Sequence, residues 1–139
     1  MSLVVGFDLD LTLVDSADGI IATYVEAGRR LGVKVDPEVV RPLIGIPLED
    51  GSAEVVPAEL VDDMVRIYRE IFPAIGVPGT TLLPGAAEAV ASVREHGGRA
   101  IVVSAKIEPG VSMVLDHVGL SVDEVVGGRY AEAKGEALR

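Results

Sequence analysis

The sequence predicts an α/β protein in which an all-helical block interrupts a parallel sheet after its first strand. Two observations lead to this prediction. Short apolar runs, typical of strands covered on both faces, occur at residues 3–7, 100–103 and 122–126. Residues 15–81 have a helical pattern instead. The chain therefore divides into an α/β core, built from residues 1–14 and 82–139, and a helical insert at residues 15–81.

The core elements follow from the apolar runs and the residues that bound them. The first strand, 3–7, leads directly into acidic residues, and the third ends at Gly127 and Gly128. A helix is expected to begin near Pro84 and to end before Gly97, ahead of the second strand. Residues 108–117 have a helical composition, so the second strand, this helix and the third strand form a βαβ unit.

The insert is expected to contain several helices. Asp15 or Ser16 can cap a first helix that runs to Arg30, and Pro37 begins a short second one. A third helix follows Pro57 and has one apolar stripe, formed by Leu60, Met64, Ile67 and Ile71. The chain is expected to leave this helix at three helix-breaking residues, Pro73, Pro78 and Gly79.

Composition restricts the class of protein. Hydrophobic residues make up 49% of the 139 residues and the mean hydropathy is +0.42, which predicts a packed core and not disorder. A net charge of −10 argues against nucleic acid or an anionic membrane as partner. The absence of cysteine excludes disulfides, thiolate metal sites and a cysteine nucleophile. With no signal-peptide or membrane-span pattern, a cytoplasmic location is the expectation.

Acidic residues stand where the first strand ends. Asp8 and Asp10 follow that strand, and Ser104 follows the second one. Ligands of open α/β sheets bind at the carboxyl ends of the strands, so these three side chains are the candidate site. A divalent cation and a phosphate would make two adjacent carboxylates compatible. Asp8 could bind Mg²⁺ and attack phosphorus, while Asp10 could protonate the leaving oxygen and later activate water.

Four stretches of the chain resemble one family. The stretch "FDLDLTLVDS" resembles the Asp-x-Asp-x-Thr first motif of the haloacid dehalogenase (HAD) superfamily. "RPLIGIPLED" is similar to a Gly-x-Pro-Leu turn in the helical cap of phosphoglycolate-phosphatase-like members. "LLPGAAEAVASVREHGGRAIVVSAK" and "VVGGRYAEAKGEALR" are similar to the second motif and to the approach to the third. The resemblance implies a HAD-like, Rossmann-like core with strands one to three side by side and residues 15–81 as its cap.

The resemblance also implies roles for the strand-end residues. Asp8 would be the nucleophile and Asp10 the general acid and base, with Mg²⁺ held by the Asp8 carboxylate and the Asp10 carbonyl. The second aspartate favours a phosphatase or a phosphomutase over a dehalogenase. Ser104 and the backbone amide of Ala105 would bind the phosphoryl oxygens. Lys134 would neutralise charge on the nucleophile and the phosphate, a position that Lys106 or Arg129 could also fill.

The family pattern stops before its fourth motif, whose acidic residues would complete the metal site. The expected explanation is a chain truncated at its C-terminus, with a natural short form as the alternative. Without the strand that carries this motif, the strand from Leu3 to Phe7 becomes an apolar edge that could pair with another chain or with a missing segment.

The function expected of the parent protein is Mg²⁺-dependent hydrolysis of a small phosphorylated metabolite. The 139-residue chain itself is expected to be inactive or nearly so and to bind Mg²⁺ weakly, because the acids of the fourth motif are missing. Phosphoglycolate is the first substrate to test, because of the resemblance. Two alternatives remain open at this point: a β-phosphoglucomutase-like phosphomutase and a non-catalytic interaction module.

Overall fold

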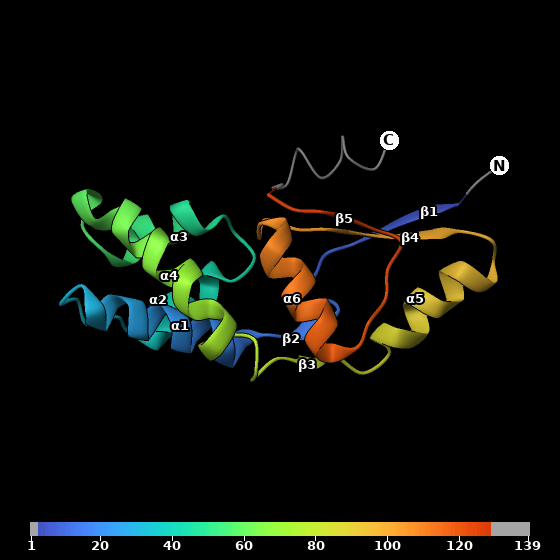
Figure 1. The fold of residues 1–139 in the computed structure, drawn as a ribbon, viewed down its shortest axis with the longest axis horizontal. Helices are drawn as coiled ribbons and strands as arrows, with labels where there is room; N and C mark the ends of the chain where they lie inside the picture. Colours follow the sequence, from blue (N-terminus) through green and yellow to red (C-terminus); the bar gives the residue numbers. More distant parts are fainter. Residues whose placement is uncertain (1–2, 129–139) are drawn as a thin grey trace.

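The computed structural model describes residues 3–128 and has the expected α/β architecture. A parallel sheet has the strand order β1-β4-β5. The strands run toward a group of helices that lies at one end of the molecule, so their carboxyl ends face these helices (Figure 1). We call the group, which spans residues 17–75, the helical block. The strands and core helices have these bounds: β1 Val4–Phe7, α5 Ala86–Glu95, β4 Arg99–Val103, α6 Glu108–Val118 and β5 Glu124–Val126.

The three predicted strands are confirmed in type and in order. Val4 of β1 is in register with Arg99 of β4, and β4 pairs in turn with β5. The third strand begins two residues later than predicted, because Asp123 makes two bonds to the backbone of Ala100. Its N–H donates to the Ala100 carbonyl at 2.9 Å, and its carboxylate accepts from the Ala100 N–H at 2.7 Å. Asp123 therefore fixes the start of β5 against β4.

The helical block contains more elements than the sequence predicted. Its elements are α1 Ala17–Arg30, α2 Pro37–Val40, the 3₁₀ turn η1 Arg41–Leu43, α3 Leu48–Val55, the 3₁₀ turn η2 Ala58–Leu60 and α4 Val61–Ile75. The Asp36 side chain caps α2, as a proline at the first helical position suggested. The predicted stripe of α4 is buried at Met64, Ile67 and Ile71, whereas Leu60 belongs to η2.

Two predicted helix ends differ from the structure. Pro73 lies inside α4, which continues to Ile75, so the prediction that the helix stops at Pro73 is wrong. Pro73 lies on the exposed side of α4, and only the last turn of the helix follows it. Proline cannot donate a backbone hydrogen bond, and at this position the loss of that bond disturbs little packing. Pro84 precedes α5 by two residues, because Gly85 holds the capping position with a φ of 86°.

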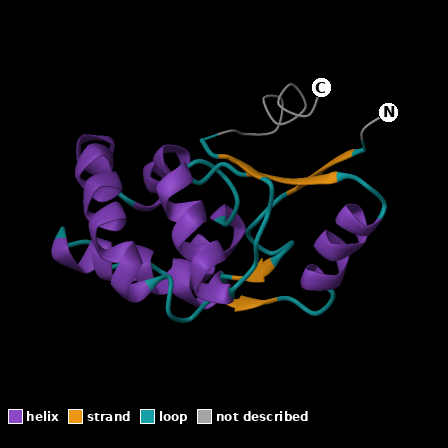
Figure 2. Cartoon of the chain, turned by 45° about the vertical axis from the view of Figure 1, so that its right-hand side comes forward, coloured by secondary structure: helices purple, strands orange, loops and turns teal. Residues whose placement is uncertain are grey.

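A two-stranded antiparallel ribbon, which the sequence did not predict, joins the sheet to the helical block. It consists of β2 Val14–Asp15 and β3 Thr81–Leu82 (Figure 2). The predicted boundaries between core and insert fall within these two strands, so the chain enters and leaves the helical block at one place. The division into two domains stays a prediction.

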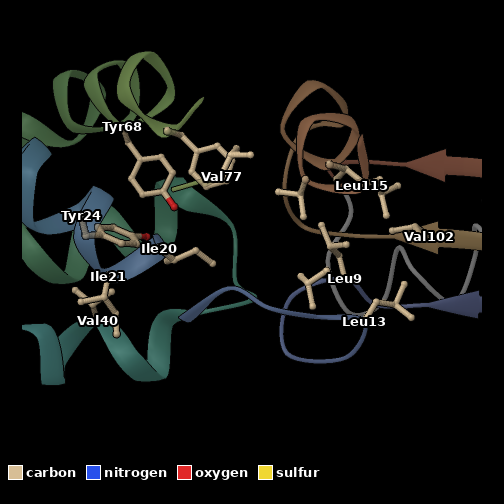
Figure 3. Close-up of a cluster of buried hydrophobic side chains, with 14 of the residues drawn as sticks. Leu9, Leu13, Ile20, Ile21, Tyr24, Val40, Tyr68, Val77, Val102 and Leu115 are labelled. Carbon is tan, nitrogen blue, oxygen red and sulfur yellow. The ribbon is translucent and has the colours of Figure 1, made fainter. Parts of the chain in front are cut away.

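One hydrophobic cluster extends from the sheet into the helical block (Figure 3). On the sheet side, Leu9, Val102 and Leu115 are buried. On the side of the helical block, Tyr24 and Tyr68 are buried. The tight turn after β1 therefore lies at the junction of the two parts. Among residues 3–128, no helix combines the length and the apolar character that crossing a membrane requires.

Candidate active site

The turn that follows β1 carries both candidate carboxylates. Asp8 comes directly after the strand, and its Oδ1 accepts a hydrogen bond from the Leu9 N–H at 2.9 Å. The Leu9 carbonyl accepts from three successive N–H groups, those of residues 12, 13 and 14. Leu11, within this turn, has a φ of 63°, an uncommon backbone conformation for a residue other than glycine. Leu9 is fully buried, so the turn is anchored in the core between the two aspartates.

Asp10 is buried and has a partner at each carboxylate oxygen. The Ser16 hydroxyl donates to Oδ1 at 2.8 Å, and the Lys106 Nζ lies 3.6 Å from Oδ2. The Lys106 and Asp10 side chains are only 13% and 6% exposed, so water screens this pair less than it screens a surface pair. The Lys106 Nζ also lies 4.5 Å from the centre of the Phe72 ring, within the range of a cation–π interaction. Lys106 therefore contacts both Asp10 and the helical block.

The loop after β4 holds Ser104, Ala105 and Lys106 in fixed positions. Ser104 is buried, its hydroxyl accepts from the Lys106 N–H at 3.1 Å, and its own N–H donates to the Val126 carbonyl at 3.0 Å. The Gly128 N–H donates to the Lys106 carbonyl at 2.9 Å. A Cβ atom at Gly127 would overlap the Glu108 N–H group, so glycine allows the end of β5 to approach this loop.

The structure brings four of the predicted site residues to neighbouring strand ends. Asp8 and Asp10 follow β1, Ser104 and Ala105 follow β4, and these two strands are adjacent in the sheet. Lys134 lies outside the described residues. Lys106, the alternative cation, is the lysine that contacts Asp10.

Sequence reasoning missed Ser16 as a partner of Asp10. It gave Asp15 or Ser16 as the cap of α1. Ser16 holds that position, but its hydroxyl makes no capping bond and donates to Asp10 instead. The N–H of Ala17 donates to Asp15 Oδ1 at 3.4 Å. The spacing of six residues between Asp10 and Ser16 is not a helical or strand repeat, so only the folded turn reveals the contact.

A cavity of about 170 Å³ separates the loop after β4 from the helical block. Asp10 and Lys106 line it from the sheet side. Most of the other lining groups are apolar, and they include Ile20, Leu43, Ile44, Ile46, Leu48, Phe72, Pro73, Ile107, Pro109 and Met113. The cavity thus opens directly onto one of the two candidate catalytic carboxylates.

Three polar side chains of the helical block also line the cavity: Tyr24, Tyr68 and Arg69. Burial raises the pKa of both tyrosines, and for Tyr68 the neighbouring Tyr24 and Asp10 raise it further. Both phenols are therefore protonated at neutral pH and are hydrogen-bond donors. The Arg69 guanidinium is paired with the Glu49 carboxylate at 3.1 Å.

The oxygen atoms of Asp8 and Asp10 suit a hard divalent cation, but within the described residues they do not form a complete set of metal ligands. The Asp8 carboxylate and the Asp10 carbonyl are oxygen ligands of the kind that Mg²⁺ prefers. The Asp10 carboxylate is engaged by Ser16 and Lys106, which favours its carbonyl over its side chain as a ligand. Among residues 3–128, no cluster of three or more acidic or histidine side chains could hold a metal ion. Asp8 and Asp10 are therefore two candidate oxygen ligands for such a cation.

The comparisons with known proteins identify the family. The sequence matches the haloacid dehalogenase-like hydrolase family over residues 5–134, and the chain belongs to that family. Two curated relatives are each 30% identical to it. "Tyrosine-protein kinase PtkA" of Mycobacterium tuberculosis matches 88% of this chain and 43% of its own length. "Probable phosphatase IndB" of Dickeya dadantii matches 86% and 55%, respectively.

The fold is also that of the family. A solved haloacid dehalogenase-like hydrolase from Bacteroides fragilis superposes with a TM-score of 0.84 at 21% identity. The alignment covers 99% of this chain and 71% of that protein. The prediction of a HAD-like fold is therefore confirmed. The chain spans about half the length of the curated relatives that it matches.

Proposed function

We propose that the protein hydrolyses a small phosphate monoester through an aspartyl-phosphate intermediate on Asp8. The observation that carries this proposal is the position of Asp8 and Asp10 in one turn at the end of β1, with Asp10 buried beside the cavity. Family membership supports the hydrolase class, and one relative is named as a phosphatase. A phosphorylated metabolite is the proposed partner, and phosphoglycolate is the first member of that class suggested by the sequence.

The proposed reaction has two displacements at phosphorus. In the first, a carboxylate oxygen of Asp8 attacks the phosphorus atom, the ester P–O bond breaks, and the leaving oxygen takes a proton from Asp10. In the second, Asp10 removes a proton from water, which attacks the phosphorus of the aspartyl phosphate and releases inorganic phosphate and the free Asp8 carboxylate. The Ser104 hydroxyl and the Ala105 N–H are proposed to bind the phosphoryl oxygens.

Positive charge is needed around the transferred group. Bound Mg²⁺ would supply part of it, held by the Asp8 carboxylate and the Asp10 carbonyl. Lys106 is the described lysine placed to supply more, because its Nζ lies beside Asp10 at the cavity. Lys134 keeps the role that the family resemblance implies.

The test is the turnover of p-nitrophenyl phosphate by the full-length parent protein and by its Asp8→Asn variant. We expect Mg²⁺-dependent turnover that stops when a chelator is added and returns with excess Mg²⁺. Asp8→Asn should abolish turnover, because an amide cannot form the phosphoenzyme. Asp18→Asn is the matched control, since Asp18 is an exposed aspartate at the start of α1.

Three results would contradict parts of the proposal. Activity of Asp8→Asn within tenfold of wild type would reject Asp8 as the nucleophile. Turnover that persists in a chelator would reject the Mg²⁺ requirement. A full-length wild-type protein with neither turnover nor a phosphoenzyme would favour the non-catalytic interaction module.

A further inference from the structure

The cavity has room for a small organic group. Its volume is about 170 Å³. An apolar cavity of about 150 Å³ in another protein holds a benzene molecule, so this one accommodates a group of comparable size. Because Asp10 and Lys106 form one wall, the group bonded to a phosphate at the strand ends would extend into this space. In the proposed reaction that group is the alcohol that leaves.

The charges around the cavity favour an uncharged group. Two cationic side chains reach it, and each already faces a carboxylate: Lys106 faces Asp10 at 3.6 Å and Arg69 faces Glu49 at 3.1 Å. The remaining walls are mostly aliphatic and aromatic. A carboxylate on the leaving group would have to compete with Glu49 for Arg69 or remain unpaired in apolar surroundings, and the second is unfavourable.

The Tyr68 hydroxyl is a donor available to a ligand in the cavity. Tyr68 is 6% exposed, and within residues 3–128 neither its hydroxyl nor that of Tyr24 makes a hydrogen bond. The ring is fixed by an edge contact with Tyr24 at 5.0 Å (Figure 3). It also stacks on Phe72 at 5.7 Å. A ligand that supplies an acceptor to this hydroxyl would gain a hydrogen bond within mostly apolar surroundings. Its position beside Asp10 places this donor next to the reacting group.

We propose that the cavity selects phosphate monoesters whose leaving group is compact, uncharged and mostly apolar, with one oxygen acceptor for the Tyr68 hydroxyl. The proposal rests on the proposed function, because it identifies the cavity as the site of the leaving group. It excludes phosphoglycolate as the preferred substrate, since the leaving group of phosphoglycolate carries a carboxylate. Arg69 and Glu49 set this preference together, because Glu49 offsets the charge of Arg69.

Binding of three phosphonates of similar size tests the proposal without any hydrolysis. The probes are butylphosphonate, 2-methoxyethylphosphonate and 2-carboxyethylphosphonate, measured by calorimetry with the full chain and Mg²⁺. We expect 2-methoxyethylphosphonate to bind most tightly and 2-carboxyethylphosphonate most weakly. Tyr68→Phe keeps the ring and removes the donor, so it should weaken 2-methoxyethylphosphonate by about three- to tenfold and butylphosphonate by less than about twofold.

A charge variant tests the role of Glu49. Glu49→Gln releases Arg69 and should strengthen 2-carboxyethylphosphonate binding by about three- to tenfold, as expected for a newly available partner of a carboxylate. Glu70→Gln is the matched control, because Glu70 pairs with Arg66 and does not line the cavity. It should leave all three affinities unchanged.

The possible results separate this inference from the proposed reaction. If 2-carboxyethylphosphonate binds most tightly, if Tyr68→Phe weakens all probes equally, or if no probe binds, the inference is overturned. If the probes bind in the expected order but no phosphate ester is hydrolysed, the binding preference of the cavity stands and the proposed reaction fails.

Discussion

Asp10 is held from both sides by buried side chains, and this arrangement bears on its proposed chemistry. The Ser16 hydroxyl donates to one carboxylate oxygen at 2.8 Å, and the Lys106 Nζ lies 3.6 Å from the other. A general acid must point at the leaving oxygen within hydrogen-bond reach. Ser16 is therefore a positioning residue for Asp10, and its effect should appear in the rate of the chemical step.

We predict that Ser16→Ala lowers kcat by about tenfold and leaves KM nearly unchanged, because Asp10 loses one of the two contacts that orient it. Asp10→Asn alone should cost about 10²–10⁴ in rate. Adding Ser16→Ala to Asp10→Asn should then cost little more, since Ser16 acts through the carboxylate. Steady-state kinetics of the two single variants and the double variant measure this. Ser92→Ala, at an exposed serine of α5, is the control.

If the rate losses of Ser16→Ala and Asp10→Asn multiply fully in the double variant, Ser16 acts independently of Asp10. A rise in KM alone would assign Ser16 to ligand binding instead.

Part of this site could be predicted from the rule that ligands bind at the carboxyl ends of parallel strands. The rest depends on the conformation of the turn after β1. Asp8, Asp10 and Ser104 could be predicted because parallel strands place their carboxyl ends at one edge of the sheet. The contact between Asp10 and Ser16 could not, because an irregular turn stabilised by the Leu9 carbonyl brings them together. Lys106 could be predicted only as an alternative cation, since the sequence does not show that its side chain folds back beneath Phe72.

At the scale of the elements, the helical block depends on a close approach of α1 to the end of α4. Gly19 in α1 faces Gly76, the residue that follows α4, and a Cβ at Gly19 would overlap the Gly76 carbonyl oxygen. The Thr80 hydroxyl donates to the same carbonyl at 3.0 Å. Because backbone lies on both sides of this contact, the structure has no flexible side chain to move aside.

We predict that Gly19→Ala destabilises the protein by about 1–3 kcal/mol, the usual cost of overpacking. Alanine is better than glycine in a helix by about 0.5–1 kcal/mol, which offsets only part of this cost. Gly79→Ala is the matched control, because a Cβ there meets nothing within 4 Å. Urea unfolding of the three proteins measures the difference. Equal midpoints for Gly19→Ala and wild type would show that the two helices can separate without cost.

Element type was easier to predict than element boundaries, for physical reasons. The apolar runs of β1 and β4 and the helical composition of α6 are strong local signals, and the structure places these elements within one residue of the predicted bounds. The ribbon of β2 and β3 has two residues in each strand, far too few to produce an alternating pattern. The two strands pair because the chain enters and leaves the helical block at the same place. The proline in α4 was misinterpreted because its effect depends on which face of the helix it occupies.

At the scale of the whole molecule, β1 is an edge strand of the sheet formed by residues 3–128. It pairs with β4 on one side and with no other strand in that part of the chain. The side chains at its start are apolar and solvent-accessible, with Leu3 47% and Val4 40% exposed. An exposed apolar edge is a template for pairing with another strand, because its outward N–H and C=O groups lack partners in a sheet.

We predict that the chain self-associates through β1 at high concentration and that Val4→Lys reduces this association. A lysine on an edge strand opposes edge-to-edge pairing, because a second copy would bury its charge. Val39→Lys is the matched control, since Val39 is 46% exposed on α2, in the helical block and away from the sheet. Sedimentation velocity over a range of concentrations measures the three proteins. A wild-type chain that stays monomeric throughout would contradict pairing between copies, and equal association of both variants would place the interface elsewhere.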